Sequence, residues 1–180
     1  MNREEDEGGK SLNKLGFGII GCGVISDWHA RSVEAIEDAY LVGVTDVNKD
    51  SRDRTALKYG VRSFDSIEQM LHQKDVDVVS ICTPSGLHAP LAIQAAKAGK
   101  HIVLEKPMAL NLKESDDIID ACEQNKVKLT VISQLRFTDS LSHVKTALTD
   151  GLLGKIIMGN IYMKYYRSEE YYNQSSWRGT

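Results

Sequence analysis

Short apolar runs alternate with segments of helical periodicity along residues 15–135, and this alternation constrains the fold more than any other feature. The runs are only three to seven residues long, and some, such as VDVVSIC at 76–82, are apolar on both faces. Strands that alternate with helices of about ten residues form a parallel sheet whose two faces are both covered. We therefore expect an α/β fold with a doubly wound Rossmann-type parallel sheet over residues 15–135.

Capping residues and glycines set the bounds of the expected elements. Gly60 ends the second helix, Gly99 ends an alanine-rich helix, and Ser66 caps a short helix between them. The expected strands are 15–20, 40–45, 62–64, 76–82, 101–104 and 129–133, and the expected helices are 24–35, 49–59, 66–72, 89–98 and 112–125.

Charge and cysteine usage exclude several classes of function. Residues 1–14 carry four consecutive acidic residues and read as an acidic flexible tail, because a signal peptide needs a basic start and an apolar core. The net charge of −3 argues against nucleic-acid or anionic-membrane partners, and no run of about 18 apolar residues predicts a membrane span. The odd set Cys22, Cys82 and Cys122 has no CxxC spacing, so we expect no disulfide framework, no metal site and a cytoplasmic location.

A glycine-rich turn follows the first expected strand and opens the first helix. Gly21 permits a tight turn, and Gly23 lets a pyrophosphate approach the backbone at the positive end of the helix. Ser26, a small residue, occupies the position of the third glycine of the dinucleotide fingerprint. We predict that this turn binds a dinucleotide, with a plain structural turn as the alternative; the residues concerned are Gly21, Gly23, Val24, Ile25 and Ser26.

Asp46 follows the second expected strand, 25 positions after Gly21. A carboxylate here accepts hydrogen bonds from the ribose hydroxyls of NAD and repels the extra phosphate of NADP. A helix-capping aspartate is the alternative. Lys49 and Arg52 lie close by in the sequence and could soften the preference, so NAD is the expected cofactor and NADP stays open.

Two further turns follow later strands at the same expected edge of the sheet. The first holds Thr83, Pro84 and Ser85 and is expected to line the nicotinamide side of the crevice. His88 opens the next helix, and we interpret it as a polar cap, with direct cofactor contact as the alternative. His29, within the first helix, is interpreted as a packing or surface residue.

The second of these turns is Glu105-Lys106-Pro107, where an acid and a base stand side by side. A surface loop is the alternative interpretation of such a tripeptide. Its place at the end of a strand favours a functional one, close to the expected position of the nicotinamide ring.

The strings GFGIIGCGVIS, TDVN, CTPSGLH and AGKHIVLEKPMAL resemble the Gfo/Idh/MocA oxidoreductases, related to glucose–fructose oxidoreductase and inositol dehydrogenase. The downstream GLLGKI and SSWRGT are similar to segments leading into the second domain of that family, so the resemblance covers residues 15–180. It implies an NAD(P)-dependent dehydrogenase or reductase that transfers hydride to or from a carbon of a sugar, cyclitol or related polyol.

The resemblance also implies roles for particular residues. Lys106 matches the catalytic lysine that hydrogen-bonds the reacting hydroxyl or carbonyl oxygen of the substrate. Glu105 and Pro107 belong to the same nicotinamide-proximal turn. Gln134 is implied on the cofactor side of the inter-domain cleft and Arg136 on the substrate side. The last pair of matches, Trp177 and Arg178, lies in a segment that can reach the cofactor in some members.

The chain also departs from the family. Members are about twice as long, with a second domain that forms the substrate wall, and the resemblance implies a homodimer or tetramer through that domain. Residues 136–180 read as its truncated beginning: a helix at about 140–148, then a strand at 156–166. The strand puts Ile157, Ile161, Met163 and Tyr165 largely on one face and needs partner strands.

The family's downstream glycine-rich turn with a His and an Asp is missing, and His143 is not a substitute. A truncated chain, a cleaved chain and a naturally short protein that borrows a partner's sheet remain open. So does a second class of function, a non-catalytic NAD(P)-binding sensor or scaffold module. A helix-pair binding module without nucleotide is a third, against which the glycine turn and Asp46 speak.

Overall fold

The computed structural model describes residues 14–173 and divides the chain into two compact units. Unit 1 runs to Ser133 and unit 2 begins at Gln134. The acidic segment expected at residues 1–14 lies outside the described residues, apart from Lys14.

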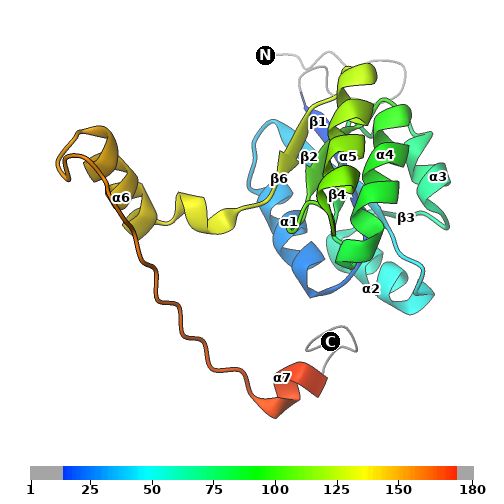
Figure 1. The fold of residues 1–180 in the computed structure, drawn as a ribbon. Helices are drawn as coiled ribbons and strands as arrows, with labels where there is room; N and C mark the ends of the chain where they lie inside the picture. Colours follow the sequence, from blue (N-terminus) through cyan, green and yellow to red (C-terminus); the bar gives the residue numbers. More distant parts are fainter. Residues whose placement is uncertain (1–13, 174–180) are drawn as a thin grey trace, which may run out of the picture. The chain divides into compact units, whose positions relative to one another are not determined.

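Unit 1 is built on one six-stranded parallel sheet with the strand order β3-β2-β1-β4-β5-β6 (Figure 1). This is the strand order common to dinucleotide-binding Rossmann folds, so the expected fold class is confirmed. The strands are β1 (Leu15–Ile20), β2 (Ala39–Thr45), β3 (Arg62–Ser63), β4 (Val78–Ile81), β5 (His101–Leu104) and β6 (Leu129–Val131).

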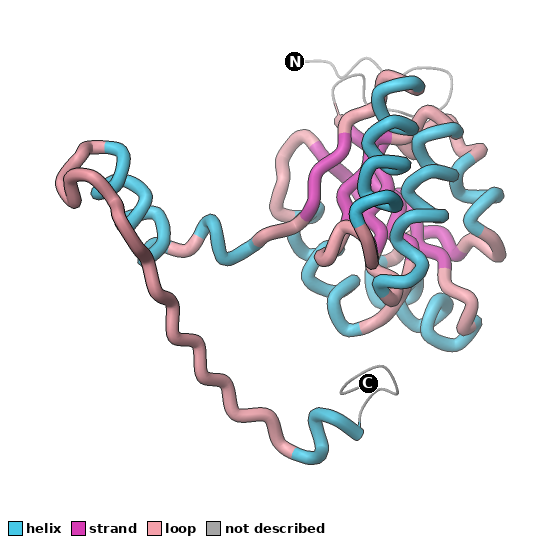
Figure 2. The backbone as a smooth tube through the Cα atoms, in the orientation of Figure 1, coloured by secondary structure: helices cyan, strands magenta, loops and turns pink. Residues whose placement is uncertain are grey.

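Helices cover both faces of this sheet (Figure 2). The α-helices of unit 1 are α1 (Val24–Glu34), α2 (Lys49–Tyr59), α3 (Ile67–Leu71), α4 (His88–Lys97) and α5 (Leu112–Gln124), and η1 (Ser85–Leu87) is a 3-10 turn. The predicted caps are confirmed: Gly60 ends α2 in the left-handed conformation, and the Ser66 side chain accepts a hydrogen bond from Gln69 N at the start of α3.

Two apolar clusters fill the two faces of the sheet. One packs β-strand residues against α3, α4 and α5, with Met70, Ala92 and Ile118 fully buried. The other packs β1 and β2 against α1 and α2 through Ala30 and Ala56. An irregularity in the β1–β2 register places one extra residue in β2, so that Val42 joins the first cluster and Val44 joins the second.

Unit 2 contains a 3-10 turn, η2 (Gln134–Phe137), and the helices α6 (Asp139–Thr149) and α7 (Glu169–Asn173). The helix expected at about 140–148 is confirmed, but the strand expected at 156–166 is wrong. Within residues 14–173 this segment pairs with no other strand, and the face expected to be buried is exposed, with Ile157 at 93%. A strand needs a hydrogen-bonding neighbour, and the described chain supplies none here.

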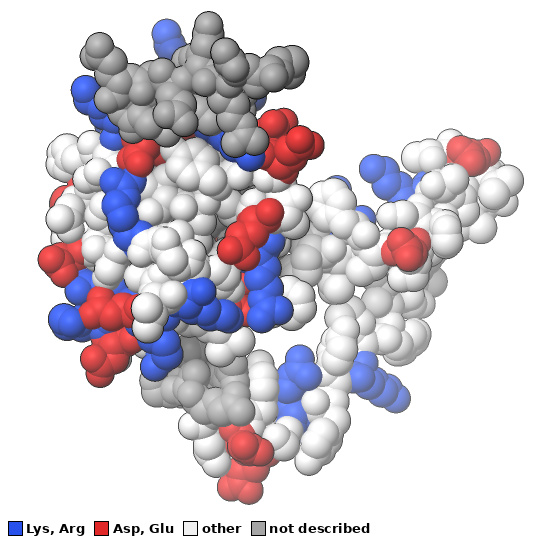
Figure 3. Space-filling view, turned by 180° about the vertical axis from the view of Figure 1, so that it is seen from behind, with Lys and Arg blue, Asp and Glu red and all other residues white. Residues whose placement is uncertain are grey.

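Charged residues of both signs are interspersed on the face of unit 1 drawn in Figure 3. Among residues 14–173, no helix is both long and apolar enough to cross a membrane.

Candidate active site at the carboxyl edge of the sheet

Four turns that are far apart in the sequence share one edge of the sheet. Strands β2, β1, β4 and β5 are adjacent and parallel, so the turns that follow them all leave at their carboxyl ends. The edge therefore brings together the glycine turn, Asp46, the turn at Thr83 and the turn at Lys106. In doubly wound sheets this is where ligands bind.

Gly21 and Gly23 serve different purposes in the glycine turn. Gly21 has φ of +94°, and a Cβ there would lie 2.9 Å from the backbone of Cys82, so a side chain is excluded on both counts. A Cβ on Gly23 would meet nothing within 4 Å. Gly23 thus leaves free space in front of α1, as a bound pyrophosphate requires.

The first turn of α1 has no side-chain cap on its backbone N–H groups, of which that of Ser26 donates to Gly23 O at 3.2 Å. Gly23 is the N-cap and supplies no side-chain acceptor, and Val24 is 81% exposed. The hydroxyl of Ser26 donates to Gly23 O at 2.6 Å, and Ser26 is 2% exposed. Ser26 therefore closes the turn and packs beneath it, and Val24 and Ile25 form the outer side.

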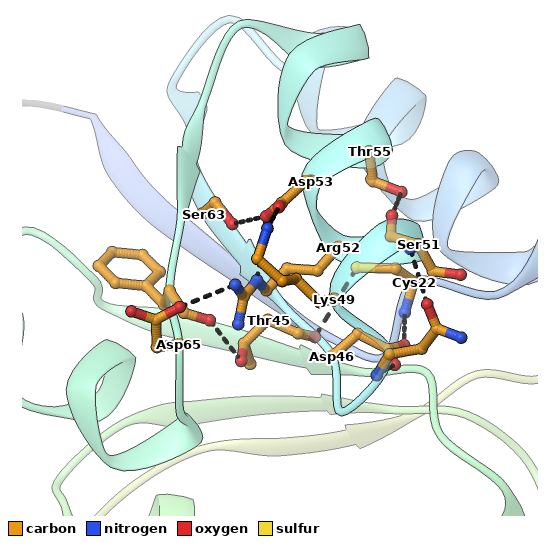
Figure 4. Close-up of polar contacts among 12 residues, drawn as sticks. Cys22, Thr45, Asp46, Lys49, Ser51, Arg52, Asp53, Thr55, Ser63 and Asp65 are labelled. Atoms are coloured by element: carbon orange, nitrogen blue, oxygen red, sulfur yellow. Dashed lines mark hydrogen bonds and ion pairs between the residues drawn. The ribbon is translucent and has the colours of Figure 1, made fainter.

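Asp46 connects the glycine turn to the end of β2 (Figure 4). Its Oδ2 accepts a hydrogen bond from Cys22 N at 2.6 Å, and its Oδ1 accepts one from Asn48 N at 2.7 Å. The helix-cap alternative is wrong, because the cap of α2 is Asn48, whose side chain accepts from Ser51 N. Burial and the Asp46 carboxylate together raise the pKa of the Cys22 thiol to about 11.

Lys49 and Arg52, which could have softened the preference for NAD, are engaged elsewhere. The Lys49 amine lies 2.5 Å from Asp53, and Arg52 contacts both Asp53 and Asp65, as Figure 4 shows. Arg52 is 7% exposed. The carboxylates of Asp53 and Asp65 therefore neutralise these two cations. Hydrogen bonds from Lys49, Ser63 and Arg52 in turn lower the pKa of Asp53.

A cavity of about 480 Å³ opens beside the glycine turn. Residues of the glycine turn and α1, including Gly23 and Asp27, line one side, and Ser51, Arg54 and Thr55 of α2 line the other. The cavity adjoins the free space at Gly23, so the glycine turn borders an opening large enough for part of a ligand.

The turn after β4 contains a buried polar atom that lacks a partner. Thr83 Oγ1 is the one buried side-chain nitrogen or oxygen among residues 14–173 without a hydrogen bond. A buried polar atom without a hydrogen bond lowers the stability of the fold unless a ligand or a water molecule bonds to it. Pro84 and Ser85 follow it at the surface side of the turn, where Pro84 precedes the 3-10 turn η1.

His88 joins the two turns on this side of the edge. Its Nδ1 lies 2.7 Å from Pro107 O and its Nε2 lies 3.0 Å from Thr83 O. The interpretation of His88 as a helix cap is wrong, because its ring contacts carbonyl oxygens of two loops instead of the free N–H groups of α4. His88 is 1% exposed, so its buried ring links the turn at Thr83 to the turn at Pro107.

The turn after β5 separates its acid from its base. Glu105 is 7% exposed, whereas Lys106 is exposed and Lys106–Pro107 is a cis peptide bond. Glu105 Oε2 accepts from Lys106 N at 3.1 Å, and Glu105 Oε1 lies 3.1 Å from His29 Nε2. The Lys106 amine has no hydrogen-bond or ion-pair partner in the described part of the chain, so it is available to a ligand.

Sequence reasoning missed His29. The expectation of a packing or surface residue overlooked its polar contact with Glu105, across 76 positions of sequence. A signal existed, because the buried residues of α1 are Ser26, His29, Ala30 and Val33, which is the inward face of the helix. A histidine on that face needs a polar partner.

The remaining expected site residues lie outside unit 1. Gln134 and Arg136 belong to η2 of unit 2. Trp177 and Arg178 lie outside the described residues. Among residues 14–173, no group of three or more His, Cys, Asp or Glu side chains could hold a metal ion.

The residues at the edge fit a nicotinamide dinucleotide. Gly23 leaves room for phosphates at the start of a helix, Asp46 offers carboxylate oxygens beside the same turn, and Thr83 has an unused hydroxyl. Along the edge, in the strand order β2-β1-β4, these groups match the requirements of a ribose at Asp46, a pyrophosphate at Gly23 and the nicotinamide half at Thr83. The fold and the edge thus define a dinucleotide-binding α/β protein of the Rossmann class.

Comparison with known proteins identifies the family. Residues 15–133 match the model of the oxidoreductase family with an NAD-binding Rossmann fold. The chain therefore belongs to this family, the Gfo/Idh/MocA oxidoreductases, as the resemblance implied, and the cofactor of the family is NAD(P).

Two curated relatives match most of the chain. It is 37% identical over 147 residues to inositol 2-dehydrogenase of Rhizobium meliloti, a match that covers 81% of this chain and 44% of the relative. It is 33% identical over 140 residues to myo-inositol 2-dehydrogenase of Thermotoga maritima, covering 77% and 42%. The chain thus spans less than half the length of these curated relatives.

A solved structure extends the match. The WlbA dehydrogenase from Bordetella pertussis, in complex with NADH and UDP-GlcNAcA, superposes with a TM-score of 0.88 at 37% identity. The match covers 93% of this chain and 49% of that one.

Proposed function

We propose that this chain supplies the cofactor half of an NAD-dependent oxidoreductase that transfers hydride between the nicotinamide and a carbinol or carbonyl carbon of a sugar, cyclitol or related polyol. The observation that carries the proposal is the single edge shared by the open glycine turn, Asp46 and the free Lys106 amine. The relatives named for inositol oxidation support the substrate class.

Lys106 is the proposed catalytic residue. The nicotinamide accepts or donates the hydride when bound, and the substrate oxygen gains or loses negative charge in the same step. An ammonium group beside that oxygen stabilises the charge, and its protons can be exchanged with the oxygen. The exposed side chain and unpaired amine of Lys106 suit this role, whereas buried Glu105 has both carboxylate oxygens engaged.

We propose NAD as the preferred dinucleotide. Asp46 stands at the end of β2 with a carboxylate that would accept ribose hydroxyls and repel a phosphate at the 2′ position. Lys49 and Arg52 are paired with Asp53 and Asp65, so they do not offset this repulsion.

Unit 2 is proposed to begin a substrate and oligomerisation domain, with Gln134, Arg136, Trp177 and Arg178 contributing to the completed cleft. Its exposed apolar residues, such as Ile157 and Ile161, support a homodimer or tetramer through this part of the chain. The three free, buried cysteines support a cytoplasmic location, where thiols stay reduced.

Replacing Lys106 with Met tests the catalytic proposal. Methionine keeps the length of the side chain and removes the charge, so turnover of a polyol such as myo-inositol should fall by about a hundredfold or more while NADH affinity changes by less than about threefold. Lys97→Met is the matched control, since Lys97 is exposed at the carboxyl end of α4, at the opposite edge of the sheet, and should leave both quantities unchanged.

Two outcomes would count against the proposal. Retention of most turnover by Lys106→Met would remove that residue from the mechanism. NADH binding without turnover of any polyol by the wild-type chain, alone or mixed with its natural partners, would favour the non-catalytic sensor or scaffold.

A further inference from the structure

We infer that His29 is a positioning residue for Lys106: it holds the buried Glu105 carboxylate, and that carboxylate holds the backbone turn from which Lys106 projects. The inference deepens the proposed function and rests on it for its kinetic part. His29 itself belongs to α1, whose first turn forms the proposed phosphate site.

The contacts of Glu105 run in two directions. Oε1 faces His29 Nε2 at 3.1 Å, and Oε2 accepts from the backbone N–H of Lys106 at 3.1 Å. An ionised carboxylate only accepts hydrogen bonds, so the His29 ring donates from Nε2. The carboxylate therefore bridges the inner face of α1 and the first peptide of the Lys106 turn.

Burial makes this bridge specific. The side chains of His29 and Glu105 are 8% and 9% exposed, so water cannot readily replace either partner. Burial, followed by the negative charge of Glu105, raises the pKa of the nearby Cys82 thiol. Removing the His29 ring would leave that carboxylate buried with one oxygen unsatisfied.

The consequence for Lys106 follows from the geometry of the turn. Its exposed amine has no partner in residues 14–173, so the backbone of the turn sets where the amine can reach. On the other side of the turn, His88 contacts Pro107 O at 2.7 Å. Two buried histidines from α1 and α4 thus hold the turn from both sides, and His29 acts through the residue directly before Lys106.

Three variants of the 180-residue chain test the inference. His29→Ala removes the donor, and His29→Gln places an amide N–H near the position of Nε2 and should restore the contact. The control is His72→Ala, because His72 is exposed and its side-chain hydrogen bond, with Glu68 O, lies within its own helix. The readouts are hydrogen exchange at the Lys106 amide, NADH affinity, and kcat and KM with myo-inositol.

We expect the Lys106 amide of His29→Ala to exchange about tenfold faster, while His29→Gln and His72→Ala stay within about threefold of wild type. We expect kcat of His29→Ala to fall by about ten- to a hundredfold, because a misplacement of about 1 Å costs that much, with KM for NAD and NADH affinity within about threefold. Rescue by His29→Gln separates positioning from mere packing.

Equal Lys106 exchange in His29→Ala and His72→Ala would overturn the inference. So would equal losses of kcat in the Ala and Gln variants. If His29→Ala does not fold, His29→Asn, whose amide is too short to reach Glu105, replaces it in the comparison with His29→Gln. A wild-type chain that binds NADH but turns over no polyol, alone or mixed with its natural partners, would count against the proposed function, and the amide exchange would still decide whether His29 holds the turn.

Discussion

Asp46 and Glu105 are two acidic residues in equivalent places that have different environments. Each directly follows a strand of the sheet, and each contacts the first β-α unit, Asp46 through Cys22 N and Glu105 through His29. Both oxygens of each carboxylate have a hydrogen-bonding partner within the protein, but Asp46 is half-buried, whereas Glu105 is 7% exposed. An acidic residue directly after a strand can thus have either of two roles. Partly exposed Asp46 can contact a ligand, whereas buried Glu105 holds other residues of the site in place.

The largest expected effect is on stability, which should depend more on Glu105 than on Asp46. Glu105→Ala leaves the buried His29 without its partner, so the free energy of unfolding should fall by about 2–3 kcal/mol, against about 1 kcal/mol for Asp46→Ala. Urea unfolding followed by circular dichroism measures both. Equal losses would mean that the difference in burial has no energetic consequence.

The preference for NADH over NADPH should depend on Asp46 and not on Glu105. Asp46→Ala removes the acceptor for ribose hydroxyls, so NADH affinity should fall by about tenfold or more. NADPH affinity should fall less, because the repulsion of the 2′ phosphate is removed with it. Glu105→Gln is the comparison variant and should leave the ratio of the two affinities unchanged. Parallel fluorescence titrations give both ratios, and a loss shared equally by NADH and NADPH in Asp46→Ala would contradict the role of this carboxylate.

A smaller effect concerns the glycine turn that Asp46 holds. Gly21→Ala forces a Cβ against the backbone of Cys82 at positive φ, and should lower the free energy of unfolding by about 1–2 kcal/mol. Gly23→Ala meets open space, so stability should change by less than about 0.5 kcal/mol while NADH binding weakens. Thermal melts and NADH titrations of both variants test this pair. Unchanged NADH affinity in Gly23→Ala would show that phosphates do not approach there.

The parallel sheet of unit 1 could be predicted because its signals are local. Apolar runs, Ser66 and Gly60 each marked an element or a cap in agreement with the structure. The glycine turn and Asp46 could be placed at one edge because parallel strands share their carboxyl ends.

The contacts of the histidines could not be predicted in the same way. His29 and Glu105 are 76 positions apart, and His88 and Pro107 are 19 apart, so their pairing depends on how α1 and α4 pack on the sheet. The prediction of a strand at 156–166 was wrong for a related reason. Its alternating apolar pattern is typical of a strand, but a strand forms only with a neighbour, and residues 14–173 contain none for it.

We propose that the edge formed by the glycine turn, Asp46 and Lys106 binds NAD. A parallel titration of the 180-residue chain with NADH and NADPH, followed by energy transfer from the exposed Trp28 on α1, tests it most directly. We expect saturable NADH binding that is at least about tenfold tighter than NADPH binding. Binding of neither nucleotide by a chain that shows a cooperative circular dichroism melt would contradict it.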